Sequence, residues 1–323
     1  MIYSDESPFE DGPVAQAVNT VASNGVLYFS SAGNQGNKDD RTSATWEGDF
    51  KASTASPPPA FIGKVVHDFG DAGQSLSVIK GNSALALIWA EHYDLSSGFA
   101  STDYDVYDMS DDLTTIFDAS TNRQDGVGGD DFPVEFLGGV FGGERIVVVR
   151  VHGGTTSSAP MFNMILFGGR AFDPALATSG ATRGHSAAAA AISVAATPAA
   201  ASFHSQSPNG PFPQLFSAPN FSETFTSDGP RRIILDSGTG AELTPGNRTS
   251  TGGCFAQQAR HHRSRRCFSG DTRIQSVLRH LRSGAACGGD CCASQIRCAT
   301  YAGAGSPSSD FHRSRYRNAG RGP

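Results

Sequence analysis

Asn34 is the residue whose type and setting most clearly suggest chemistry. It lies between Gly33 and Gly36, so its side-chain amide belongs to a tight turn whose backbone can approach another group closely. An amide N–H held in such a turn can stabilise a developing negative charge, which is the role of an oxyanion-hole donor. The alternative is an Asn-Gly loop without chemistry. The elements that precede the turn favour the first interpretation.

A predicted helix and a predicted strand lead the chain to Asn34. The helix begins at Asp11-Gly12-Pro13 and ends at Asn24-Gly25, which are a typical start and stop. The strand, Val26–Phe29, is short, apolar and followed by small residues, as expected for a buried parallel strand that ends in a turn. Apolar residues recur along the helix with helical spacing: Val14, Ala17, Val18, Val21 and Ala22.

This helix and strand, ending in Ser-Ala-Gly-Asn, resemble the segment of subtilisin-like serine peptidases (subtilases) that carries the oxyanion asparagine. The resemblance implies that Asn34 is the oxyanion donor and that Ala32 and Gly33 line the wall of the primary specificity pocket. Two later segments resemble sequence phrases of the same family: Ile-Ser-Val-Ala-Ala at Ile192–Ala196 and Ser-x-Gly-Pro at Ser227–Pro230. The implied fold is a doubly wound parallel α/β sheet.

Residues 61–169 follow a different pattern, with short apolar or alternating runs separated by Gly, Asp, Asn and Ser. Such runs, with no helical period between them, predict an antiparallel β-sandwich. We expect this module to be inserted between two subtilase-like α/β parts, residues 1–55 and residues 180–253. The predicted strands are Val65–Phe69, Ser75–Ile79, Ala84–Trp89, Tyr104–Met109, Val134–Leu137, Ile146–Val151 and Phe162–Phe167.

Two groups of residues invite a further assignment. Alternate carboxylates within the sandwich could bind calcium, although the spacing of an EF-hand is absent. The favoured alternative is a solvated acidic strand edge that prevents edge-to-edge pairing, so no metal ligand and no cofactor is assigned. The carboxylates are those of Asp103, Asp105, Asp108, Asp111 and Asp112.

His185 and Ser186 form the second group. They are adjacent and therefore too constrained to act as base and nucleophile for each other, which predicts a structural role.

The charge distribution divides the chain near residue 254. Residues 1–253 contain 13 Lys and Arg against 28 Asp and Glu, a net charge of −15, and no cysteine. Residues 254–323 contain 12 Arg, no Lys and three Asp, a net charge of +9, and all six cysteines. No secretory leader pattern opens the sequence and no apolar run approaches membrane-spanning length. We expect that the true start of the parent protein is missing.

The last segment has three interpretations. A zinc site lacks paired Cys-x-x-Cys knuckles, and a nucleic-acid site lacks a binding motif to accompany its arginines. The third explains more. Permissible codons for Leu278–Cys292, read one base later, spell YGTSAAAPHAAAIA, which resembles the Gly-Thr-Ser nucleophile motif of subtilases. We infer a frameshift between about Gly253 and Gln257 and expect residues 254–323 to be a disordered, out-of-frame tail.

The subtilase mechanism needs an aspartate, a histidine base and a serine nucleophile besides the oxyanion donor. By the resemblance, the first two would precede this sequence and the serine is lost to the frameshift, so only Asn34 remains. We predict a serine endopeptidase by family, acting on proteins or peptides outside the cell, and an inactive fragment in this chain. The alternative is that the sandwich is a binding module for calcium, polysaccharide or protein. No nucleic-acid or membrane partner is expected.

Overall fold

The computed structural model describes residues 6–70, 73–93, 98–127, 130–153, 159–168, 171–196 and 222–256 of the chain. This part is mostly β-structure, and most of its strand pairs are antiparallel. It contains one α-helix, α1 (Pro13–Ser23), and two short 3-10 helices, η1 (Pro59–Phe61) and η2 (Gly184–Ala187). The tail predicted over residues 254–323 lies outside the described residues from residue 257 onward.

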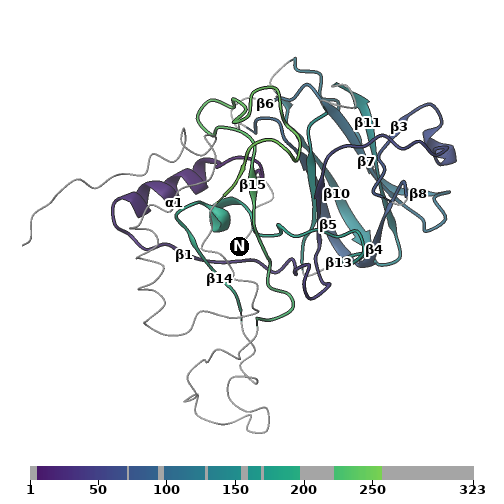
Figure 1. The fold of residues 1–323 in the computed structure, drawn as a ribbon. Helices are drawn as coiled ribbons and strands as arrows, with labels where there is room; N and C mark the ends of the chain where they lie inside the picture. Colours follow the sequence, from purple (N-terminus) through teal and green to yellow (C-terminus); the bar gives the residue numbers. More distant parts are fainter. Residues whose placement is uncertain are drawn as a thin grey trace, which may run out of the picture.

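Two antiparallel sheets occupy one side of the molecule (Figure 1). The first has the strand order β10-β5-β12-β2, and the second has the order β13-β4-β11-β7-β8 with β3 also paired to β11. The bounds of the first are β2 Thr45–Gly48, β5 Asn82–Trp89, β10 Val134–Phe141 and β12 Phe162–Leu166. Those of the second are β3 Val65–Val66, β4 Leu76–Lys80, β7 Asp103–Met109, β8 Ile116–Ser120, β11 Arg145–His152 and β13 Ala171–Phe172.

The two sheets pack face to face around one apolar core. Leu85, Leu87 and Trp89 point into it from β5, since alternate residues of a strand face the same side. Tyr104 and Val106 of β7 meet them from the other sheet. The predicted antiparallel β-sandwich is confirmed by this arrangement.

The sheets of the sandwich extend beyond the predicted bounds of 61–169 at both ends. Strand β2 pairs with β12 and buries Trp46 in the core, where the indole stacks on Phe162 at 4.6 Å between ring centroids. Strand β13 pairs with β4 and buries Phe172 completely. Both strands are too short to be recognised by their pattern, and their partners are remote in sequence.

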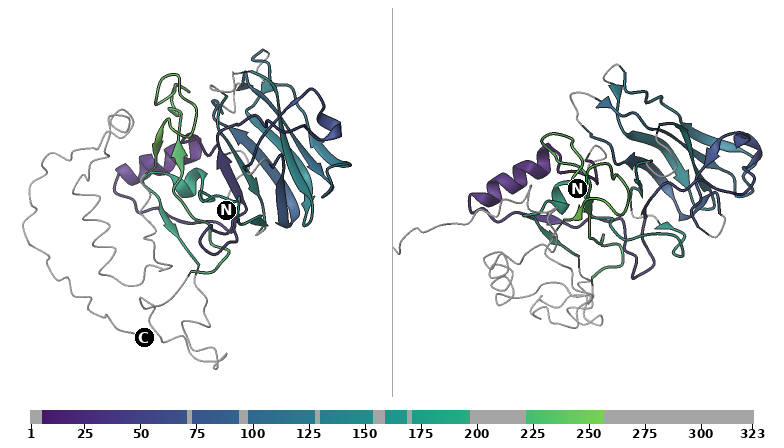
Figure 2. Two further views of the ribbon diagram at one scale, coloured as in Figure 1. Left: turned by 45° about the vertical axis from the view of Figure 1, so that its right-hand side comes forward. Right: turned by 45° about the horizontal axis from the view of Figure 1, so that its top comes forward.

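Helix α1 and the strands β1 (Phe29–Ser31) and β14 (Ile192–Val194) lie on the other side of the four-stranded sheet (Figure 2). Gly12 caps the helix in an extended conformation and Pro13 occupies its first turn, as predicted. The buried face of α1 differs from the predicted stripe. Ala15 and Val18 are buried, whereas Val14 and Val21 remain exposed, because the helix packs on the small residues around η2 through one narrow face.

The side of the four-stranded sheet that faces away from the core is partly covered as well. Ile88 and Met161 on this side contact Phe9, Ile234 and Leu235 from the α1 side of the molecule. Strand β15 (Arg232–Ile233) leads into this contact and pairs with β16 (Cys254–Phe255). The short parallel pair β6 (Gly98–Phe99) and β9 (Asp130–Asp131) completes the described strands.

Polar and charged side chains reinforce this junction. Glu10 Oε2 lies 2.6 Å from His92 Nδ1, and Glu10 Oε1 accepts a hydrogen bond from the Tyr93 main-chain N–H at 2.5 Å. Arg248 Nη1 donates to Glu91 Oε1 at 2.7 Å, and Glu91 is almost completely buried. The sandwich is therefore joined to the rest of the chain by both apolar packing and buried charges.

Candidate functional site

Strand β1 delivers Asn34 to the end of a parallel strand pair. Phe29, Ser30 and Ser31 pair in parallel with β14, and the main-chain N–H of Ala32 continues the ladder by donating to Val194 O at 3.0 Å. The strand thus begins three residues later and ends two residues later than the predicted strand over 26–29. Phe29 and Val194 are about half exposed, so the expected complete burial of this strand is not observed.

Glycine is required at Gly36, on one side of the Asn34 turn. Gly36 has φ of +69°, and a Cβ built there would lie 2.0 Å from the Thr42 carbonyl oxygen. Gly33, on the other side, has φ of +112°. A side chain at either position would strain or displace the turn.

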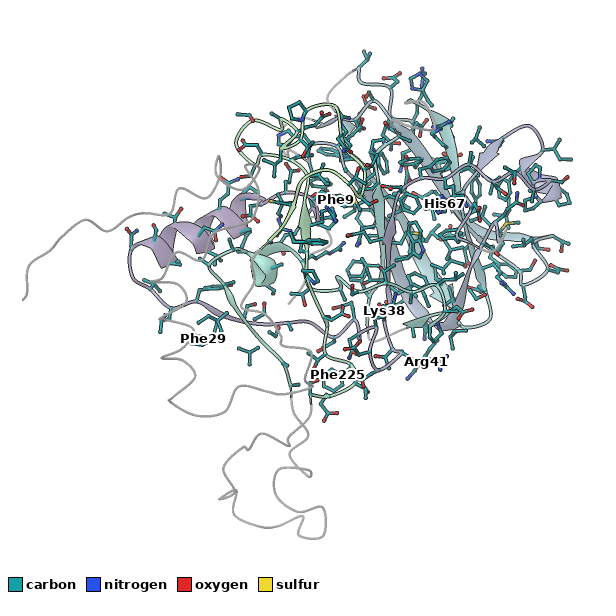
Figure 3. The ribbon with its side chains drawn as sticks, in the orientation of Figure 1. Phe9, Phe29, Lys38, Arg41, His67 and Phe225 are labelled. Carbon is teal, nitrogen blue, oxygen red and sulfur yellow. The ribbon has the colours of Figure 1, made fainter. Side chains whose placement is uncertain are left out.

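A shallow pocket of about 380 Å³ opens beside this turn. Its lining contains no charged residue; Asn34 and two serines supply its polar groups. Phe29, one of its apolar residues, projects from β1 on the side remote from the sandwich (Figure 3). The full lining is Phe29, Ser30, Ser31, Gly33, Asn34, Val194, Ala195 and Ala196.

The side chain of Asn34 is exposed, and in the described part of the chain no hydrogen bond engages its amide. Its main-chain N–H donates to Gln35 Oε1 at 2.9 Å. Gly33 lines this pocket, whereas Ala32 is buried behind the turn and its carbonyl oxygen accepts a hydrogen bond from Thr182 Oγ1 at 3.0 Å. The assignment of both residues to a specificity pocket stays a prediction.

His185 and Ser186 point to different partners. His185 is buried, with Nδ1 at 2.9 Å from Glu6 Oε2, and its main-chain N–H donates to Glu6 Oε1 at 2.9 Å. The Ser186 hydroxyl lies 2.9 Å from the Ser30 hydroxyl. The two residues do not face each other, in agreement with the structural role predicted for them.

Three of the five aspartates of the sandwich are not on a solvated edge, so that interpretation was wrong for β7, whereas Asp111 and Asp112 in the loop after it are exposed. Strand β7 lies between β11 and β8, and Asp103, Asp105 and Asp108 are buried on it. The sequence pattern shows alternation but not the position of a strand within its sheet. Among the residues that the structure describes, no group of three His, Cys, Asp or Glu side chains could hold a metal ion, so calcium gains no support from them.

Burial raises the pKa of several carboxyl groups in this region. Burial raises the pKa of Asp103 to about 6, with a further contribution from Asp105. Glu135 is fully buried and its pKa rises to about 7, although Ser120, Gln124 and Asn122 donate hydrogen bonds to it. These groups are protonated more readily than exposed carboxyls, as expected of buried acids without a cationic partner.

The sequence interpretation missed two residues that hold the Asn34 turn, Gln35 and Ser227. Gln35 Oε1 accepts from the Ser227 hydroxyl at 3.1 Å, and the Gln35 main-chain N–H donates to Ser227 Oγ at 2.9 Å. Ser227 is the first residue of the Ser-x-Gly-Pro phrase, and this phrase was the sequence signal that could have pointed to it. The contact spans 192 positions and is invisible to any local pattern.

Comparison with known proteins identified no matching family model, no similar curated protein and no similar solved structure. Within the residues that the structure describes, no helix has both the length and the apolar character needed to cross a membrane. The assignment of a function therefore depends on the geometry of the chain itself.

Proposed function

We propose that residues 1–55 and 180–253 form the oxyanion-hole corner of a subtilisin-like serine endopeptidase, part of a partial doubly wound parallel sheet. In this chain the corner binds peptides without hydrolysing them. The observation that supports this is the side-chain amide of Asn34, which none of the described residues engages, beside an uncharged pocket at the carboxyl end of β1. Open α/β sheets place their ligands at that end of their strands.

Hydrolysis requires a nucleophile and a base as well as an oxyanion donor. The chain contains no Gly-Thr-Ser sequence, and we assign the parental motif to the shifted reading frame of Leu278–Cys292. His185, the histidine nearest in sequence to β14, is held by Glu6 in the interior. An oxyanion donor alone supports at most residual acceleration, so the proposed activity is recognition of a peptide, with an extracellular parent enzyme by resemblance.

Peptide binding is tested with an N-acetylated tetrapeptide that ends in leucine and carries a free carboxylate. The carboxylate oxygen would accept the Asn34 amide hydrogen bond, and leucine suits an uncharged pocket. We expect Asn34→Ala to weaken binding about tenfold or more, because a charged acceptor loses its donor. Asn24→Ala, at an exposed asparagine that follows α1, serves as the matched control. Equal affinity in wild type and Asn34→Ala would contradict the proposal.

Hydrolysis and the frameshift are tested separately. Purified chain should release no chromophore from a peptide anilide above the buffer rate; turnover that Asn34→Ala abolishes would show that the chain is an active enzyme. The nucleotide sequence across codons 250–300 tests the shifted frame directly. Codons for Leu278–Cys292 that do not spell the Gly-Thr-Ser motif one base later would remove the frameshift from the proposal.

A further inference from the structure

Gln35 and Ser227 form a closed pair of hydrogen bonds directly behind the Asn34 turn. Gln35 Oε1 accepts from the Ser227 hydroxyl at 3.1 Å, and Ser227 Oγ accepts from the Gln35 main-chain N–H at 2.9 Å. Gln35 Oε1 also accepts from the Asn34 main-chain N–H at 2.9 Å. Both side chains are buried, at 6% and 2% exposed. In this low-dielectric setting the bonds hold their geometry more firmly than they would in water.

Main-chain bonds seat the segment of Ser227 on the same turn. Ser227 N–H donates to Gly33 O at 3.1 Å, and Gly36 N–H donates to Phe225 O at 2.9 Å. Asn37 Nδ2 donates to Thr226 O at 3.3 Å. Figure 3 shows Phe225 below the loop that carries Lys38 and Arg41. The turn is thus held on both sides of Asn34 by residues almost two hundred positions away.

These bonds have one consequence for Asn34. Its main-chain N–H is occupied by Gln35, whereas its side-chain amide is exposed at the pocket and has no partner in the described part of the chain. Of the two donors that Asn34 possesses, only the side chain remains available to a ligand. Fixing the main chain also fixes where that side chain begins, which is the requirement for a preorganised donor.

We propose that Gln35 and Ser227 are positioning residues that lock the Asn34 main chain, so that the Asn34 side-chain amide is the donor presented to a bound peptide. The part concerning the peptide rests on the proposed function. The lock itself does not, because it is a property of the unliganded turn.

The experiment measures two quantities on the full chain. The first is the hydrogen-exchange rate of the Asn34 main-chain amide by NMR; the second is the affinity for the leucine-ended peptide carboxylate. Gln35→Met preserves length and removes the acceptor, whereas Gln35→Glu keeps an acceptor oxygen. Ser227→Ala and Ser227→Thr form a second pair that removes or keeps the hydroxyl. Gln74→Met, at another buried glutamine on the sandwich, controls for loss of stability alone.

We expect Gln35→Met and Ser227→Ala to speed exchange at Asn34 about tenfold and to weaken peptide binding by a similar factor. Gln35→Glu and Ser227→Thr should restore both, and Gln74→Met should change neither. Unchanged exchange at Asn34 in both Gln35→Met and Ser227→Ala would overturn the lock. If Gln35→Met speeds exchange at Asn34 but the wild-type chain does not bind the peptide, the positioning role of Gln35 is supported and the proposed function is overturned.

Discussion

His67 is a completely buried ionisable ring in the described part of the sandwich. It is fully buried among Trp46, Phe69 and Phe162, and Nδ1 accepts the Lys51 main-chain N–H at 3.1 Å. No hydrogen-bond acceptor meets its buried Nε2. Burial lowers the pKa of His67 to about 3, against an ordinary value near 6.5. The imidazole is therefore neutral in the folded protein.

This residue should make the fold sensitive to acid. The unfolded chain binds a proton at His67 below about pH 6.5 and the folded chain only below about pH 3, so the stability it contributes is complete above 6.5 and is lost as pH falls between these values. We expect His67→Phe to reduce the slope of unfolding free energy against pH by up to about 1.4 kcal/mol per pH unit. Urea titrations from pH 4 to 6.5 measure it.

A neighbouring aromatic residue provides the control for this titration. Phe69→Leu should lower stability by a similar amount at every pH, because it removes packing next to His67 without removing a titrating group. If His67→Phe and wild type show parallel pH profiles, the neutral buried imidazole is not the source of the acid sensitivity.

Asp108 should make the fold less stable as pH rises, which is opposite to the effect of His67. It is 1% exposed, and burial together with the carboxyl groups of Glu144 and Asp118 raises its pKa to about 8. Its stabilising contribution is complete below the unfolded value of about 4 and is lost as pH rises through the higher folded value. Asp108→Asn should therefore gain stability relative to wild type between pH 5 and pH 8. A constant difference over that range would show that the carboxyl does not titrate there.

At the scale of elements, the Asn34 turn depends on close backbone approach at Gly36. A methyl group there would meet the Thr42 carbonyl at 2.0 Å and would also oppose a φ of +69°. We expect Gly36→Ala to cost about 2 kcal/mol or more and to weaken peptide binding, because the loop must move. Gly63→Ala is the matched control, with φ of +81° and open space around its Cβ, and should cost roughly 1 kcal/mol. If Gly36→Ala and Gly63→Ala lower the unfolding free energy equally in chemical denaturation, the contact with Thr42 contributes nothing and the positive φ explains the whole loss.

At the scale of the whole molecule, the sandwich and the α1 side share a buried interface rather than a linker. Phe9 is fully buried there against Ile88 and Met161 of the sandwich side. We expect wild type to unfold in one calorimetric transition and Phe9→Ala to lower its stability by about 3–5 kcal/mol. Phe117→Ala, at a ring that is 55% exposed on β8, should have a small effect. Two separate transitions in wild type would show that the parts fold independently.

This interface also bears on the alternative that the sandwich is a binding module. Phe9, Ile234 and Leu235 occupy the part of the four-stranded sheet's outer side around Ile88 and Met161, so this part is not available to a ligand, whereas Phe136 of β10 is 42% exposed on the same side. A module cut out at residues 61–169 would in addition lose β2 and β13. Such a segment would expose Ile88 and Met161 and would be expected to associate in solution.

The sequence alone determined the features that depend on local order. Short apolar runs between loop residues predicted strands such as β5 and β11, and Gly12-Pro13 with Asn24-Gly25 predicted the ends of α1, since local hydrophobicity and backbone freedom are properties of neighbouring residues. Tertiary structure decided which distant segments meet. It placed β7 inside a sheet and brought Ser227 to Gln35, because the partners of a face or a side chain depend on chain topology, which no local pattern records.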